Sequence, residues 1–114
     1  ALARAEPNAA VLQLAGLVQS RLGQAARAES LLSGALALAP NLVDARHELA
    51  MLQLRAGRPD RALAVLEPVL EPALADAALW QAAGQAYAQL GRFRQADEAF
   101  ARASKVRPDD PALR

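Results

Sequence analysis

Apolar and small residues recur in steps of three and four along the last third of the chain. They are Leu79, Ala83, Ala86 and Leu90, followed by Ala96, Phe100 and Ala103. This spacing places each set on one face of a helix and is incompatible with the alternation of a β-strand. Gly91 separates the two sets and Pro108 follows the second, which is the chemistry of a helix C-terminus and of a helix stop. The pattern predicts a helical hairpin between Ala77 and Asp110.

The same hairpin pattern occurs twice more upstream, and it does so without an insertion. Three columns of residues are each separated by 34 positions: Gly23, Gly57 and Gly91; Ala28, Ala62 and Ala96; Leu32, Leu66 and Phe100. A fourth column, formed by Gly16, Ala50 and Gly84, always holds a residue small enough for a neighbouring helix to approach closely. A period of about 34 residues built from paired helices is typical of one class of repeat protein.

The upstream units also predict which positions are buried. We expect the first helix of unit one to bury Val11, Ala15, Val18 and Leu22, and that of unit two to bury Ala45, Leu49, Leu52 and Ala56. The second helix of unit one should run from about Gln24 to Ala39 and bury Ala28, Leu32 and Ala35. In unit two Pro59 suits a first helical turn, but Pro68 falls inside the second helix, where it removes a backbone hydrogen bond. We therefore expect a kink or an early helix end at Pro68.

The third unit resembles the tetratricopeptide repeat family. The resemblance is carried by Trp80, Gly84, Tyr87, Ala96, Phe100 and Pro108, while the earlier units keep the spacing but have Leu12 and Arg46 at the place of Trp80. The family implies an all-α fold, an α-solenoid of three tandem helical hairpins wound as a right-handed superhelix, with units at residues 9–42, 43–76 and 77–110. We also expect residues 1–8 to end a preceding repeat helix and residues 111–114 to begin a following repeat.

Composition narrows the possible functions. The 114 residues carry 13 basic and 12 acidic side chains without long blocks of either sign, which gives no basic patch for nucleic acid. No apolar run approaches the ~18 residues of a spanning helix, so membrane insertion is not expected. The absence of cysteine excludes disulfides and thiolate chemistry. Richness in Ala and Arg suggests a bacterial source, and the compartment, cytoplasmic or periplasmic, stays open.

The sequence offers little for catalysis. His47 is the only histidine, and a metal site would need it together with carboxylates such as Asp44 and Glu48, which form no recognised metal-ligand motif. The adjacent Asp97 and Glu98 point in different directions around a helix, which disfavours a paired acid and base. We therefore predict no enzyme activity, no catalytic or metal site and no cofactor.

What remains is a binding surface. In the family, the first helices of successive repeats line a concave groove that holds a peptide, and the resemblance implies the same arrangement here. The groove-lining residues predicted from it are Gln13, Leu17, Asp44, His47, Met51, Leu54, Gln81 and Gln85. This mixture of amides and moderately apolar side chains suits main-chain hydrogen bonds and shallow apolar contacts with a peptide.

Three functions are compatible with these observations. The first is a non-catalytic scaffold, part of a longer repeat array, that binds a protein or peptide partner in its groove. The second is an accessory repeat region of a larger bacterial enzyme of the glycosyl- or sulfo-transferase type. The third is end-to-end self-association, because faces at the two ends should lack cover. These faces are Val11, Ala15 and Val18 at one end and Ala99, Phe100 and Ala103 at the other.

Overall fold

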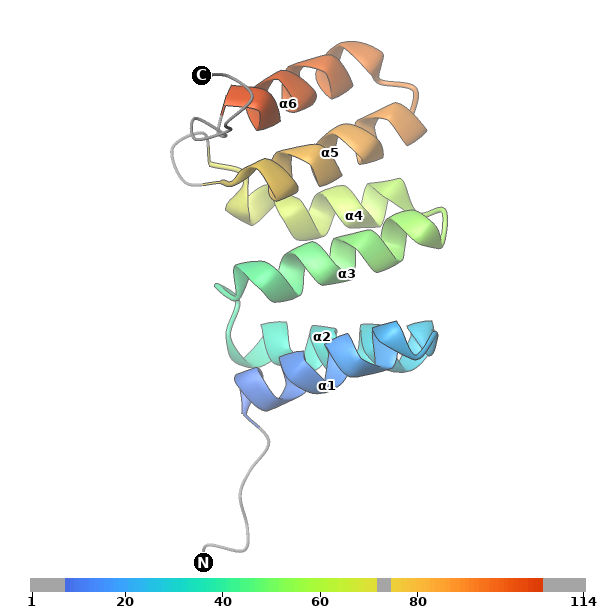
Figure 1. Ribbon diagram of the computed structural model, residues 1–114, viewed down its shortest axis with the longest axis vertical. Coiled ribbons are helices and arrows are strands. Elements are labelled where there is room, and N and C mark those ends of the chain that lie inside the picture. The colour runs from blue at the N-terminus through green and yellow to red at the C-terminus, as the bar shows by residue number, and fades with distance from the viewer. Residues whose placement is uncertain (1–7, 72–74, 106–114) are drawn as a thin grey trace, which may run out of the picture.

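The computed structural model describes residues 8–71 and 75–105, and this part of the chain forms helices and no strands. The helices are α1 (Ala9–Arg21), α2 (Ala25–Leu38), α3 (Val43–Arg55), α4 (Pro59–Leu66), α5 (Ala77–Gln89) and α6 (Phe93–Lys105), with a short 3₁₀ turn, η2 (Glu67–Val69), after α4. Consecutive helices pair into three hairpins that stack along the long axis of the molecule (Figure 1). The prediction of an all-α solenoid is confirmed.

The partial repeats expected at the two ends fall almost entirely outside the described residues. Only Asn8 of the predicted 1–8 segment is described, and it is the N-cap of α1: its side-chain Oδ1 accepts a hydrogen bond from the backbone N–H of Val11 at 2.9 Å. A polar side chain in this role satisfies one of the backbone donors that a helix N-terminus leaves free.

The turn inside each hairpin depends on a glycine. Gly23, Gly57 and Gly91 have φ angles of 79°, 75° and 77°. Side chains other than glycine meet a steric penalty in this left-handed region, so the recurrence of glycine at 34-residue intervals has a backbone cause. The turn positions predicted from the sequence are confirmed.

The two helices of a hairpin touch where the column of small residues lies. A Cβ atom added to Gly16 would lie 2.7 Å from Cγ of Leu32, and one added to Gly84 would lie 2.6 Å from Cε1 of Phe100. In the middle hairpin the corresponding residue is Ala50, which is fully buried. The small residues therefore do bring the helices close together, as the sequence predicted.

Pro68 ends α4 early. The helix stops at Leu66 after eight residues, whereas α2 and α6 have 14 and 13, and the chain continues as the 3₁₀ turn η2. Proline has no N–H to continue the α-helical hydrogen-bond pattern, which accounts for this change. The early helix end predicted from Pro68 is confirmed, as is Pro59 in the first helical turn.

Arg46 bridges the start of α3 and the end of α4. Its Nε donates to the carbonyl oxygen of Pro40 at 2.8 Å, and its Nη1 donates to the carbonyl oxygen of Val65 at 2.9 Å. The Val65 carbonyl lies in the last turn of α4, where helical partners run out. Arg46 occupies the position that Trp80 has in the third hairpin. Its guanidinium group stands where Trp80 has an aromatic ring, and it donates to a carbonyl group near the end of the shortened helix α4.

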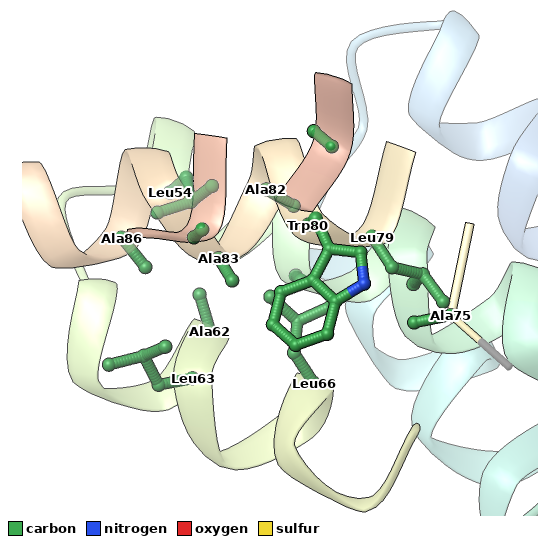
Figure 2. Close-up of a cluster of buried hydrophobic side chains, with 13 residues drawn as sticks. Leu54, Ala62, Leu63, Leu66, Ala75, Leu79, Trp80, Ala82, Ala83 and Ala86 are labelled. Carbon is green, nitrogen blue, oxygen red and sulfur yellow. The ribbon is translucent and has the colours of Figure 1, made fainter. Parts of the chain in front are cut away.

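The core lies between successive hairpins and consists mainly of alanine and leucine. One cluster joins α2 to α3 through Ala28, Leu32, Ala45, Leu49 and Leu52. The larger cluster joins α3 and α4 to α5 and α6, and the indole of Trp80 on α5 lies beside Leu66 of α4 within it (Figure 2). Each hairpin thus buries its apolar face against its neighbour, which is how a solenoid builds a continuous core.

The burial predicted for this face of α1 is wrong, whereas the lack of cover expected for Val11 and Val18 at this end is confirmed. Val11, Val18 and Leu22 are 55, 47 and 65 % exposed, although the corresponding Ala45 and Leu52 of α3 are buried as expected. On α3 these positions pack against the second helix of the preceding hairpin, and for α1 the part of the chain that would precede it lies outside the described residues. Burial at these positions comes from the neighbouring hairpin.

Two further burial predictions need correction. Ala56 is exposed, because it caps the C-terminus of α3 and leads into the turn. Ala99 and Ala103 were expected to lack cover, but both are buried in the larger core cluster beside Trp80. Only Phe100 of that group is substantially exposed, at 41 %.

Candidate functional site

The residues predicted to line a groove lie on α1, α3 and α5. Gln13, His47 and Gln81 share one position of the 34-residue repeat, and Leu17, Met51 and Gln85 share the position four residues later. Residues four apart lie on the same face of a helix. α3 contacts both α1 and α5. The six side chains therefore follow equivalent positions of three neighbouring helices, and we call them the first-helix row.

The row is neither fully exposed nor part of the core. Gln13, Leu17, His47 and Met51 are partly buried, and Gln81 and Gln85 are exposed. Met51 also packs against the larger core cluster while it remains partly exposed. A row of this kind offers shallow apolar contacts with amide groups between them.

Two predicted groove residues lie apart from the row. Asp44 is exposed at the start of α3, where a carboxylate is favoured by the helix dipole. Leu54 is only 5 % exposed and belongs to the core cluster shared with α5, so it offers almost no surface to a partner. We therefore leave Leu54 out of the candidate site.

The row includes one polar atom that the fold leaves unsatisfied. Oε1 of Gln13 is buried and has no hydrogen-bond donor among the described residues. A buried acceptor without a donor is unfavourable by about 1–3 kcal/mol.

A cavity of about 350 Å³ opens beside the α1 end of the row. It lies between the turn that follows α1 and the C-terminal half of α3. Its lining residues are Ser20, Arg21, Gly23, Ala25, Glu48, Leu52 and Arg55. Sequence reasoning missed this cavity, although Arg21 and Arg55 are 34 residues apart and so occupy equivalent positions. The combination of two guanidinium groups with the Glu48 carboxylate suits polar groups of either charge.

A second, smaller cavity lies between α5 and α6. It has a volume of about 160 Å³ and is lined by Trp80, Tyr87, Gln95, Glu98, Ala99 and Arg102. The guanidinium carbon of Arg102 lies 5.2 Å from the centroid of the Trp80 ring, a cation–π contact within the hairpin. Because Arg102 already covers the indole face, this cavity offers less to a ligand than its aromatic lining suggests.

The described residues show neither a metal-ligand group nor a membrane-spanning helix. No cluster of three or more His, Cys, Asp or Glu side chains in residues 8–71 and 75–105 is arranged to hold an ion, and His47 lies in the row without such partners. None of the helices in this part is both long and apolar enough to cross a bilayer.

Comparisons with known proteins agree with this architecture. Two family models described as tetratricopeptide repeat match residues 21–84 and 76–114. A solved structure of MamA, from residue 41 to its end, from Desulfovibrio magneticus RS-1 superposes with a TM-score of 0.80 at 28 % sequence identity. The match covers 90 % of this chain and 58 % of the MamA chain, so the chain spans less than two thirds of that protein. A search of curated proteins gives no match.

Proposed function

The chain belongs to the tetratricopeptide repeat family, and on this premise we propose that it is a non-catalytic scaffold that binds a peptide segment of a partner protein along the first-helix row. The observation that carries the proposal is the continuity of the row. Three neighbouring helices present partly exposed side chains at the same two positions of the repeat, while the core is completed by other residues.

The chemistry of the row defines the kind of peptide it suits. Gln13, Gln81 and Gln85 carry both donors and acceptors, which match the backbone N–H and C=O groups of a bound segment. Leu17 and Met51, at the second of the two repeat positions, supply apolar contact, with the unbranched methionine able to adapt its shape. A peptide with small or medium apolar side chains spaced between exposed backbone groups therefore fits best.

The row carries little charge of its own. Its six members include the imidazole of His47 and no lysine, arginine or carboxylate, and the ion pair that the described residues contain, between Arg58 and Glu29, lies elsewhere, on α2 and the α3–α4 turn. Affinity should therefore depend weakly on salt, because no exposed ion pair across the interface is needed. This separates the proposal from electrostatic capture of a highly charged partner.

The experiment is selection of peptides from a displayed random library on the full chain, followed by titration against variants. Gln85→Lys and His47→Ala should each weaken a selected peptide by roughly tenfold or more if these residues lie centrally in the interface. Gln95→Lys changes an exposed glutamine of α6 outside the row and should leave the affinity unchanged. Peptides that bind Gln85→Lys as tightly as the parent, or that lose affinity with Gln95→Lys, would refute the proposal.

A further inference from the structure

The outer face of α1 carries apolar side chains that no described residue covers. We define this face by Val11, Ala15, Val18 and Gln19, of which Val11 and Val18 are 55 and 47 % exposed. On α3 the equivalent positions hold Ala45, Leu49, Leu52 and Gln53, all buried at the contact with α2. The α1 outer face therefore has the residue pattern of a hairpin surface that another second helix covers.

The outer face of α6 has the complementary pattern. We define it by Asp97 and Phe100, which occupy the positions that Glu29 and Leu32 have on α2; the adjacent Ala96 is already buried. On α2 these residues pack against α3, and Leu32 is fully buried. On α6 Phe100 packs one side of its ring on Gly84 and remains 41 % exposed.

The two contacts between hairpins differ in the polarity of one equivalent pair of residues. At the first, Nε2 of Gln53 donates to Oε2 of Glu29 at 2.9 Å, and Gln53 is only 5 % exposed. At the second, the equivalent residues are Tyr87 and Leu63, which belong to one apolar cluster. At the first contact Oε1 of Gln53 has no hydrogen-bond partner among the described residues, and an amide against leucine would leave its N–H groups without a partner as well.

The two outer faces carry the polar version of this pair. Asp97 of α6 stands at the position of Glu29, and Gln19 of α1 stands at the position of Gln53. We infer that a second copy of this chain stacks its α1 outer face on the α6 outer face of the first. The Gln19 amide of one copy donates to the Asp97 carboxylate of the other, and Val11 and Val18 cover Phe100.

This contact joins two different surfaces of the same chain. A heterologous contact of this kind leaves one α1 face and one α6 face free at the ends, so further copies can add in the same way. The inference rests on the repeat positions and on the Glu29–Gln53 hydrogen bond. It does not use the first-helix row, so the two proposals can fail separately.

The first test is the mass of the full chain in solution from micromolar to millimolar concentration, by sedimentation velocity. The mass should rise with concentration, and Val18→Glu should weaken association by roughly tenfold or more because it places a charge in an apolar contact. Val18 is exposed in the single chain, so this variant should keep its helical circular dichroism. A chain that stays monomeric over the whole range overturns the inference and assigns the cover of α1 to other segments.

The second test fixes which residues meet. The chain has no cysteine, so mixed single variants Gln19→Cys and Asp97→Cys, one carrying a mass tag, can be joined by a short bismaleimide only at those positions. Cross-linking should exceed that of Gln19→Cys with Glu98→Cys, since Glu98 points to the cavity beside Trp80. A chain that carries both Glu29→Cys and Gln53→Cys is the positive control, because these two positions meet within one chain. Its cross-linking yield is the yield expected for correctly placed residues. Equal yields with positions 97 and 98 overturn the proposed contact.

Discussion

Replacement of Gly84 by alanine tests the close contact between the two helices of the third hairpin. An added Cβ would lie 2.6, 2.7 and 2.8 Å from three ring atoms of Phe100, well inside van der Waals contact. Overpacking of this kind costs about 1–3 kcal/mol. Alanine in place of a helical glycine returns up to about 1 kcal/mol through helix propensity. We therefore expect Gly84→Ala to reduce the free energy of unfolding by up to about 2 kcal/mol.

The middle hairpin supplies the matched background for this experiment. There Ala50 occupies the glycine position and Leu66 the phenylalanine position, and both are fully buried. When Phe100 is replaced by leucine, Gly84→Ala gives the third hairpin the alanine–leucine pair of the middle hairpin. In that chain Gly84→Ala should therefore be neutral or stabilising by up to about 1 kcal/mol. The two substitutions should therefore show a coupling free energy of at least about 1 kcal/mol.

The assay is urea denaturation of the four chains of this cycle, followed by circular dichroism and by the fluorescence of Trp80, the only tryptophan. Coincident transitions from the two probes would justify a single unfolding free energy for each chain. If Gly84→Ala has the same effect with Phe100 and with Leu at position 100, the ring moves aside freely. The contact would then not constrain the hairpin.

Three further predictions follow from burial and hydrogen bonding. Glu29→Leu should reduce the free energy of unfolding by about 1–3 kcal/mol, because it leaves the buried Gln53 amide without its acceptor. Glu29→Leu combined with Gln53→Leu should be nearly neutral, and denaturation midpoints of the two variants test the difference. Asp76→Ala should cost about 1 kcal/mol by removing the N-cap of α5, seen as a lower midpoint in thermal unfolding. Leu66→Ala should cost about 2–5 kcal/mol because Leu66 is fully buried, while Leu22→Ala, at an exposed position, should change the same denaturation measurement by less than about 0.5 kcal/mol.

Local features of the fold were predictable from the sequence because they have local causes. Gly57 is required by its positive φ, and Pro68 ends α4 by lacking an N–H. The small residue at position 84 lies directly against the ring of Phe100. In each of these cases the physical constraint acts within one hairpin, so one repeat unit contains the information.

Burial was predicted less well because it depends on the neighbouring hairpin. Val18 and Leu52 occupy equivalent positions of α1 and α3, yet Val18 is exposed and Leu52 is buried. Leu54 was expected in the groove, but α5 packs against it and includes it in the core. Periodicity identifies the face of a helix, and only the arrangement of helices decides what covers that face.

The candidate site was predicted in position but not in its surroundings. The first-helix row follows from the repeat spacing, whereas the cavity beside Arg21 and Arg55 forms where a turn of one hairpin meets a helix of the next. The role of Arg46 was equally hidden, since its acceptors are carbonyl groups freed by the end of α4 and by the α2–α3 link. Every residue has a backbone carbonyl group, so the residue pattern could not show which of these groups would accept a hydrogen bond from Arg46.

The most direct test of the proposed binding surface is nuclear magnetic resonance of the full chain during titration with a selected peptide. The side-chain amide signals of Gln81 and Gln85 and the methyl signal of Met51 report on the row, and the amide of Gln95 reports on α6 outside it. We expect the signals of Gln81, Gln85 and Met51 to shift progressively with bound peptide while that of Gln95 stays unchanged. Shifts confined to Gln95 and to α2, α4 and α6 would contradict it.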